Sequence, residues 1–219
     1  MQPLNPLLTI DKLVALIETA GARILVAYGA PEEADYWNRA MALRHRLPGL
    51  MVLRVAPHDA DRPPAHDGDG DFQALLADQP GDHLVSGRQI QPDDIAAFFH
   101  TGGTTGAPKL AMHTHGNQVF TAWASVQLQG TRTDDITINA YPLFHVAGVL
   151  PGSLTQLSAG VEMIIPTTTL LRNPDVRRNY WRLVEKYRVT SISAVPTILA
   201  AIAELPTDGI DISSVRYCR

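Results

Sequence analysis

Short apolar runs alternate with stretches of helical periodicity along the first quarter of the chain. Apolar residues recur every three or four positions over residues 9–20, which predicts an amphipathic helix that Thr9 caps and Gly21 ends. The runs at 24–28 and 51–55 are short and rich in aliphatic and β-branched residues, which predicts strands. Because helices alternate with buried strands, we expect a mostly parallel sheet.

The pattern changes between residues 57 and 94, where Asp, Pro and Gly dominate and only residues 72–77 have helical character. We interpret 57–94 as a connection between two α/β units, residues 1–56 and 95–219, which belong to one incomplete domain. The sequence DGDGD at 67–71 resembles the start of a calcium loop but lacks the glycine and glutamate that such a loop needs. A solvated loop is the favoured interpretation.

The second unit resumes the alternation of strands and helices. Its apolar runs predict strands at 95–100, 110–113, 135–139, 161–165 and 190–195. The helical periodicities of the chain, besides the one already described, lie at 31–47, 117–129, 148–158, 175–187 and 196–204. The predicted fold class is therefore α/β, with alternating helices and mostly parallel strands.

Composition and charge narrow the function classes. Of 219 residues, 45% are hydrophobic, which is typical of a packed globule. The net charge of −4 comes without blocks of like charge, so we expect neither a nucleic-acid nor an anionic-membrane partner. The single cysteine, Cys218, excludes an internal disulfide, and no apolar segment is long enough to cross a membrane, so we expect a cytoplasmic protein.

Residues 101–109, TGGTTGAPK, combine the groups that a phosphate-binding loop needs. Glycines let the backbone approach an anion with its N–H groups, hydroxyl groups add donors, and a lysine supplies charge. The candidate ligand-binding residues are Thr101, Gly102, Gly103, Thr104, Thr105, Gly106 and Lys109. The alternative is a flexible glycine-rich turn with a solvated lysine.

This loop does not match the Walker A pattern of P-loop kinases. That pattern places glycine before the lysine and Ser or Thr after it, whereas Pro108 precedes and Leu110 follows Lys109. Pro108 has no N–H group to donate, and a strand rather than a helix is predicted next. An unrelated P-loop kinase is therefore disfavoured.

The sequence TGGTTGAPKLAMHTHGN at 101–117 resembles the phosphate loop of the acyl-adenylate-forming superfamily, which includes acyl- and aryl-CoA synthetases. It departs from that family's pattern at Gly102, where serine is common, and at Leu110, where glycine is usual. YPLFHVAG (141–148) is similar to the family's segment beside the acyl pocket, and SISAVPTILAAI (191–202) resembles a later segment on the same side.

The resemblance implies part of the large N-terminal domain of an acyl-CoA synthetase-like fold. The family's adenine-contacting turn, its Tyr-Gly-x-Thr-Glu segment, its ribose-binding aspartate and its C-terminal domain with the adenylation lysine have no counterpart here. We therefore expect an internal fragment of an ATP-dependent acid:CoA ligase that is inactive alone. The alternative is a non-catalytic binding or interaction module that retains the α/β shell, and exposed apolar faces would favour a homo-oligomer.

The resemblance also implies the chemistry and the site. ATP, Mg²⁺ and coenzyme A would be used with a small, hydrophobic carboxylic acid. The loop would bind the β- and γ-phosphates of ATP, and His145 would act at the acid site, with a histidine that caps a turn as the alternative. Val195, Pro196, Thr197 and Ile198 would line the acyl tunnel, with apolar core as the equal alternative.

Two groups of side chains invite a functional interpretation that the residues themselves disfavour. His100, His113 and His115 flank the loop, but no cysteine or carboxylate joins them at ligand spacing, so no metal site is predicted. Trp123, Tyr180 and Trp181 lie on predicted helices, where they are expected to pack in the core or between helices.

Overall fold

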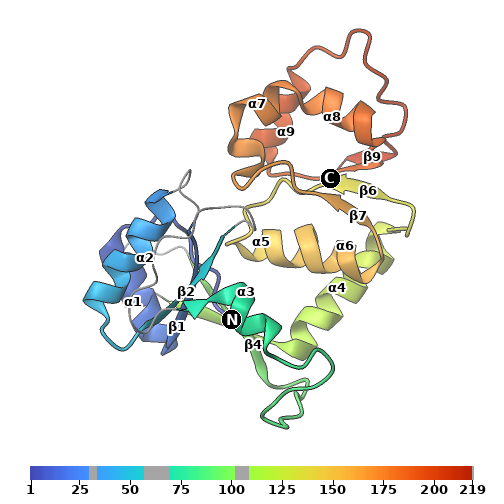
Figure 1. Cartoon of the computed structure of the whole chain (residues 1–219). Helices are drawn as coiled ribbons and strands as arrows, with labels where there is room; N and C mark the ends of the chain where they lie inside the picture. The colour runs from blue at the N-terminus through green and yellow to red at the C-terminus, as the bar shows by residue number, and fades with distance from the viewer. Residues whose placement is uncertain (30–33, 57–69, 102–108, 219) are drawn as a thin grey trace. The chain divides into compact units, whose positions relative to one another are not determined.

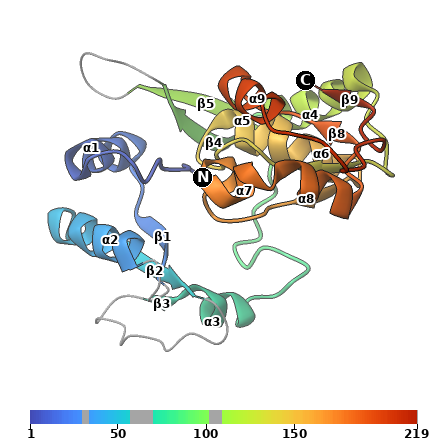
Figure 2. The same cartoon turned by 90° about the horizontal axis from the view of Figure 1, so that it is seen from above.

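The computed structural model describes residues 1–29, 34–56, 70–101 and 109–218. The chain divides into two compact units, Met1–Gln91 with Ala97–Met112 and Pro92–Ala96 with His113–Arg219 (Figures 1 and 2). Residues 67–69 of the DGDGD sequence at 67–71, interpreted as a solvated loop, and residues 102–108 of the predicted phosphate loop lie outside the described residues.

The first unit contains a small parallel sheet with three helices. The strands follow the order β1-β2-β3, with β1 spanning Ile24–Tyr28, β2 spanning Met51–Val55 and β3 spanning Gly70–Asp71. The helices are α1 (Ile10–Ala20), α2 (Ala34–Arg46) and α3 (Phe72–Ala77). Helix α2 packs against β1 and β2, and α3 packs against β2 and β3.

Helix α1 has the boundaries that its sequence predicts. The hydroxyl group of Thr9 accepts a hydrogen bond from the Lys12 N–H at 3.4 Å, and Gly21 ends the helix in the left-handed conformation at φ 62°. The buried face of α1 supplies Leu13 and Ile17 to a hydrophobic cluster. Local capping and periodicity therefore determine this element.

Strands β4 (Ile95–His100) and β5 (Leu110–Thr114) form a separate two-stranded sheet. The Thr101 N–H donates to the Lys109 carbonyl, whereas the His115 N–H donates to the Asp94 carbonyl. The partners thus run in opposite directions along the chain, so β4 and β5 are antiparallel. Among the described strands, this pair is the antiparallel exception in the mostly parallel arrangement that the sequence predicts.

The second unit is built on a four-stranded sheet of order β7-β6-β8-β9, in which each strand pairs with its neighbour in parallel. Its strands are β6 (Ile136–Ile138), β7 (Glu162–Ile164), β8 (Ser191–Ile192) and β9 (Tyr217–Cys218). The parallel α/β organisation predicted for this part of the chain is confirmed, although the strands are shorter than their apolar runs.

Helical layers cover both faces of this sheet (Figure 1). One layer contains α4 (His115–Gln129) and the continuous run of α5 (Val146–Val149), the π-helix η2 (Leu150–Leu154) and α6 (Thr155–Ser158). The other contains the 3-10 helix η3 (Leu170–Arg172) and helices α7 (Pro174–Arg178), α8 (Tyr180–Tyr187) and α9 (Pro196–Ala203). The single helix predicted over 175–187 is wrong, because Asn179 at φ −101° and ψ 14° separates α7 from α8.

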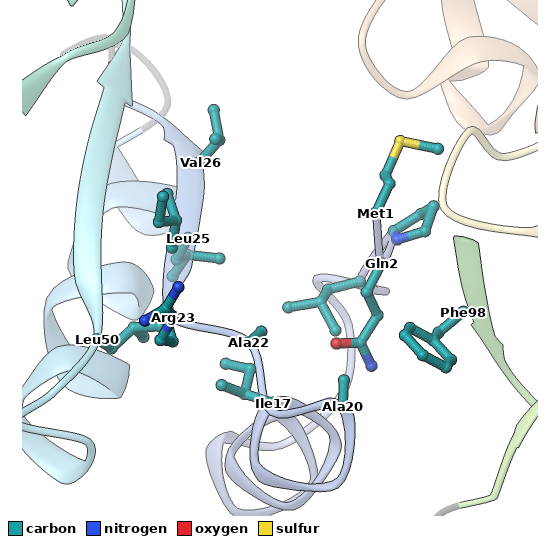
Figure 3. A pocket seen from close by; sticks show the side chains of 13 residues that line it. Met1, Gln2, Ile17, Ala20, Ala22, Arg23, Leu25, Val26, Leu50 and Phe98 are labelled. Carbon is teal, nitrogen blue, oxygen red and sulfur yellow. The ribbon is translucent and has the colours of Figure 1, made fainter. Parts of the chain in front are cut away.

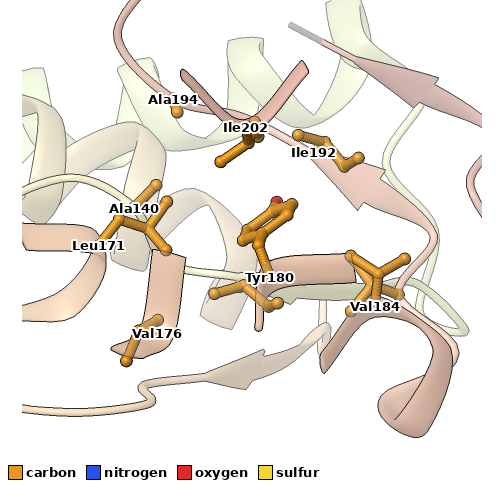
Figure 4. Close-up of a cluster of buried hydrophobic side chains, with 10 residues drawn as sticks. Ala140, Leu171, Val176, Tyr180, Val184, Ile192, Ala194 and Ile202 are labelled. Carbon is orange, nitrogen blue, oxygen red and sulfur yellow. The ribbon is translucent and has the colours of Figure 1, made fainter. Parts of the chain in front are cut away.

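The second layer and the sheet enclose the main hydrophobic core of this unit (Figure 4). Tyr180 is 1% exposed at its centre, surrounded by Ile192 from β8 and Ile202 from α9. Trp181 contacts the ring of Tyr180 edge-on at 5.3 Å between centroids, and its indole N–H donates to the Ile202 carbonyl. The predicted packing role of these two aromatic residues is confirmed.

Trp123 differs from that prediction. Its side chain on α4 is 59% exposed and meets only Phe120 as a ring partner in the part of the chain described, at 6.2 Å between centroids. Helical position alone did not reveal which face of α4 is covered, so the expectation that Trp123 packs in the core or between helices was wrong.

Candidate functional site

The base of the predicted phosphate loop is held by the ends of β4 and β5. The Thr101 N–H donates to the Lys109 carbonyl at 3.0 Å, and the Thr101 hydroxyl group donates to the same oxygen at 3.3 Å. Thr101 and Lys109 are both exposed. The structure therefore brings the first and last candidate residues together, whereas Gly102–Gly106 lie outside the described residues.

The last residue of β5, Thr114, and the residues that follow it have a structural role. Thr114 accepts from the Asn117 N–H at 3.1 Å, while the Asn117 side chain accepts from the Thr114 N–H at 3.2 Å. This reciprocal capping box begins α4 directly after the strand. His115, the first residue of α4, is fixed through its backbone N–H to Asp94.

His145 caps the short helix α5. Its Nδ1 accepts a hydrogen bond from the Ala147 N–H at 3.1 Å, and its own N–H donates to the Pro142 carbonyl at 2.9 Å. Because Nδ1 is the acceptor, the neutral ring carries its proton on Nε2. The side chain is exposed, so capping leaves an N–H group on the other side of the ring as a donor for a ligand.

The turn before His145 depends on a glycine. A Cβ atom built on Gly148 would lie 2.2 Å from the Pro142 carbonyl oxygen, which no side chain tolerates without movement of the backbone. The Gly148 N–H in turn donates to the His145 carbonyl at 2.9 Å. The glycine in the YPLFHVAG segment is thus required for the close approach that places His145.

The carboxyl ends of β6 and β8 carry the two further segments of the predicted site. The Tyr141 hydroxyl group, beyond β6, lies 2.7 Å from the Ser193 hydroxyl group, beyond β8. Ligands of open α/β sheets bind at this edge. Val195 occupies the N-cap position of α9 and is 40% exposed, whereas Ile198 packs against the hydrophobic core. For Ile198 the structure therefore supports the alternative of an apolar core residue.

The amino ends of the same strands hold a buried carboxylate that sequence reasoning missed. Asp135, which precedes β6, is 1% exposed and accepts hydrogen bonds from the Thr190 hydroxyl group and the Arg132 N–H. Burial raises the pKa of Asp135, but these bonds and the guanidinium group of Arg216 outweigh it and hold the pKa below its usual value. Because Asp135 lies at the opposite end of these strands from the candidate site, we assign it a role in holding the sheet together.

Two further features bear on ligand chemistry. A largely apolar pocket of about 720 Å³ in the first unit is lined by Met1, Ile17, Leu25, Leu50 and Phe98 among others (Figure 3). Of the predicted site residues that the structure describes, none lines this pocket. Within the described ranges, no three His, Cys, Asp or Glu side chains gather as they would around a metal ion, and no helix is long and apolar enough to span a membrane.

Comparison with known proteins finds relatives over the whole described chain. The family model of the AMP-binding enzyme matches residues 1–218. Marinolic acid–CoA ligase of Pseudoalteromonas sp. (strain SANK 73390) is 31% identical over 99% of this chain and 33% of its own length. 4-coumarate–CoA ligase 2 of Nicotiana tabacum is 32% identical over 97% of this chain and 36% of its own length. The chain thus spans about a third of these relatives.

Solved structures agree with the fold. The ATP-bound MatB from Rhodopseudomonas palustris superposes with a TM-score of 0.72 at 25% identity, over 99% of this chain and 38% of that chain. The anthranilate CoA ligase AuaEII in complex with anthranoyl-AMP has a TM-score of 0.77 at 24% identity, over 99% of this chain and 39% of that chain.

Proposed function

Since the chain belongs to the AMP-binding enzyme family, we propose that it supplies the phosphate loop and the acid-site histidine of an ATP-dependent acid:CoA ligase. In this reaction a carboxylate oxygen attacks the α-phosphorus of ATP, and pyrophosphate leaves. The thiol of coenzyme A then attacks the acyl carbon of the acyl-AMP, and AMP leaves with the bonding electron pair. Because the chain spans about a third of its relatives, we propose that the complete reaction requires the remaining length.

The loop would act by charge neutralisation. Backbone N–H groups of Gly102–Gly106 and the hydroxyl groups of Thr104 and Thr105 would donate to the β- and γ-phosphates, and Lys109 would add a positive charge. The observation that supports this role is the double hydrogen bond from Thr101 to Lys109. It joins the first and last candidate residues at the base of the loop.

His145 would orient the acid. With Nδ1 engaged by Ala147, the Nε2–H group would donate to one carboxylate oxygen and leave the other free to attack phosphorus. The neighbouring segment YPLFHVAG is apolar apart from the histidine and the tyrosine hydroxyl group, which supports a hydrophobic acid. The names of the relatives differ in their acids, so they do not assign one to this chain.

Mg²⁺ would enter with the triphosphate. Within the part of the chain that the structure describes, no set of side chains gathers as metal ligands would. The loop's N–H, hydroxyl and ammonium groups can all donate to phosphate oxygens, and a hydroxyl oxygen can also coordinate Mg²⁺. We assign no residue of this chain to the metal.

Calorimetric titration of the chain with Mg²⁺–ATP tests the proposal. We expect binding by the unaltered chain that Lys109→Ala weakens and the double variant Thr105→Ala, Lys109→Ala abolishes. Lys12→Ala is the matched control, because Lys12 is an exposed lysine on α1 and its loss should leave the titration unchanged. Binding that survives the double variant would contradict the assignment of the loop and favour the alternative of a non-catalytic module.

A further inference from the structure

The side chain of Asn139 is buried at the carboxyl end of β6, two residues before the YPLFHVAG segment. It is 2% exposed, and its backbone N–H donates to the Ile164 carbonyl at 3.0 Å, which continues the pairing of β6 with β7. A buried amide without partners would be costly, so its hydrogen bonds define what the residue does.

Both ends of the Asn139 amide are occupied. Its Oδ1 accepts from the Tyr141 N–H at 2.9 Å, and its Nδ2 donates to the Ser153 hydroxyl oxygen at 3.3 Å and lies 3.7 Å from the sulfur of Met163. The orientation of the amide follows from chemistry, because the Tyr141 N–H can only donate and therefore requires the oxygen.

Ser153 continues this connection back to the same segment. Its hydroxyl group donates to the Gly148 carbonyl at 2.7 Å. One amide side chain is thus linked directly to Tyr141 at the start of the segment and, through Ser153, to Gly148 at its end. These hydrogen bonds close a ring of residues that contains His145. The backbone N–H of His145 donates to the Pro142 carbonyl, and its carbonyl accepts from the Gly148 N–H.

The surrounding backbone leaves room for this arrangement. A Cβ atom at Gly152 would lie 3.0 Å from Oδ1 and 3.3 Å from Nδ2 of Asn139. Gly152 and Ser153 both belong to the π-helix η2, an irregular turn of the kind that is frequent at functional sites. The π-turn therefore brings a small residue and a hydroxyl group to the amide.

We propose that Asn139 and Ser153 are positioning residues that hold the His145 ring, with Nδ1 fixed by Ala147, in place for the carboxylate of the acid. The purpose of this positioning rests on the proposed function of His145, whereas the hydrogen bonds that hold the turn do not depend on that proposal. The two residues touch neither the acid nor ATP; they act through the Tyr141–Gly148 turn.

Nuclear magnetic resonance of the full chain, labelled with ¹⁵N, tests the geometry. We expect one ring tautomer for His145 and slow hydrogen exchange at the Ala147 N–H. Asn139→Ala and Ser153→Ala should raise that exchange rate by about two- to tenfold, the factor expected for loss of one hydrogen bond, and should shift the ring nitrogen signals of His145. Ser153→Thr, which keeps the hydroxyl group, should restore both signals.

Ser158→Ala is the matched control. Its hydroxyl group also donates to a backbone carbonyl, that of Thr155 at 2.8 Å, but lies outside the ring. It should leave the His145 and Ala147 signals unchanged. Unchanged signals in folded Asn139→Ala and Ser153→Ala, or an equal change in Ser158→Ala, would overturn the inference.

Addition of a hydrophobic carboxylate such as benzoate separates the two proposals. A response of the His145 ring that weakens in Asn139→Ala supports both. Signals that depend on Asn139 without any response to benzoate retain the positioning role and contradict the acid-site role of His145.

Discussion

The hydroxyl group of Thr190 donates a hydrogen bond of 2.6 Å to the carboxylate of Asp135, which lies 55 positions earlier in the chain. Arg216 and the Tyr217 hydroxyl group donate to the same carboxylate, the latter at 3.3 Å. These residues precede or begin β6, β8 and β9, so one buried acid connects the amino ends of three parallel strands. The opposite ends of β6 and β8 are thereby fixed for the candidate site.

Asp135→Asn should destabilise the second unit strongly. The amide cannot accept all the hydrogen bonds and leaves Arg216 without its charge partner, so we expect a loss of about 2–4 kcal/mol in the free energy of unfolding. Urea denaturation measures it. Asp134→Asn is the control, since the Asp134 side chain is 66% exposed and its ion pair with Arg132 should contribute at most about 1 kcal/mol. Equal losses in the two variants would contradict the framework role.

The same carboxylate predicts how stability depends on pH. Burial raises the pKa of the Asp135 carboxyl group, but its hydrogen bonds and Arg216 lower this pKa by a larger amount. The pKa of Asp135 in the folded chain therefore lies below its pKa in the unfolded chain. Its stabilisation is therefore complete above the unfolded value of about 4 and is lost as the pH falls through the folded value. Melting temperatures between pH 3 and 7 should fall more steeply at the acidic end for the unaltered chain than for Asp135→Asn. Melting temperatures that fall equally with pH in the two chains would contradict this role of Asp135.

Features with local signals were predictable from the sequence. Helix α1 has its cap, its periodicity and its terminal glycine within one short stretch, and all three are found in the structure. The break at Asn179 was missed because the helical pattern continues through it. Strand β9 was missed because two residues carry no periodicity and become a strand only through pairing with β8.

Some residues of the candidate site were predictable from the sequence, and others were not. Thr101 and Lys109 were named from their motif, and the structure joins them. The importance of Asn139 and Asp135 was invisible, because the first acts through an irregular turn and the second through partners 55 to 82 positions away. A polar residue whose partner lies in an irregular turn or far away in the sequence gives no periodic pattern by which it could be predicted.

Gly148→Ala should disturb both stability and the site. The new methyl group would meet the Pro142 carbonyl oxygen at 2.2 Å, so the turn must open, at an expected cost of about 2–4 kcal/mol in the free energy of unfolding. Gly49→Ala is the control, because nothing lies within 4 Å of a Cβ atom there, and its effect should stay within about 0.5 kcal/mol. Thermal unfolding compares them, and a neutral Gly148→Ala would show that the turn relaxes without cost.

Helix α4 should drive self-association of the isolated chain. Its exposed apolar side chains are Val119 (69%), Phe120 (65%), Trp123 (59%) and Leu128 (88%). Burial of such a face between copies removes apolar area from water at about 25 cal/mol per Å², so sedimentation velocity should show a concentration-dependent oligomer. Phe120→Gln with Trp123→Gln should shift it toward the monomer. Leu84→Gln with Val85→Gln, an equally exposed apolar pair outside α4, should not; a monomer at all concentrations in the unaltered chain would contradict the role of this face.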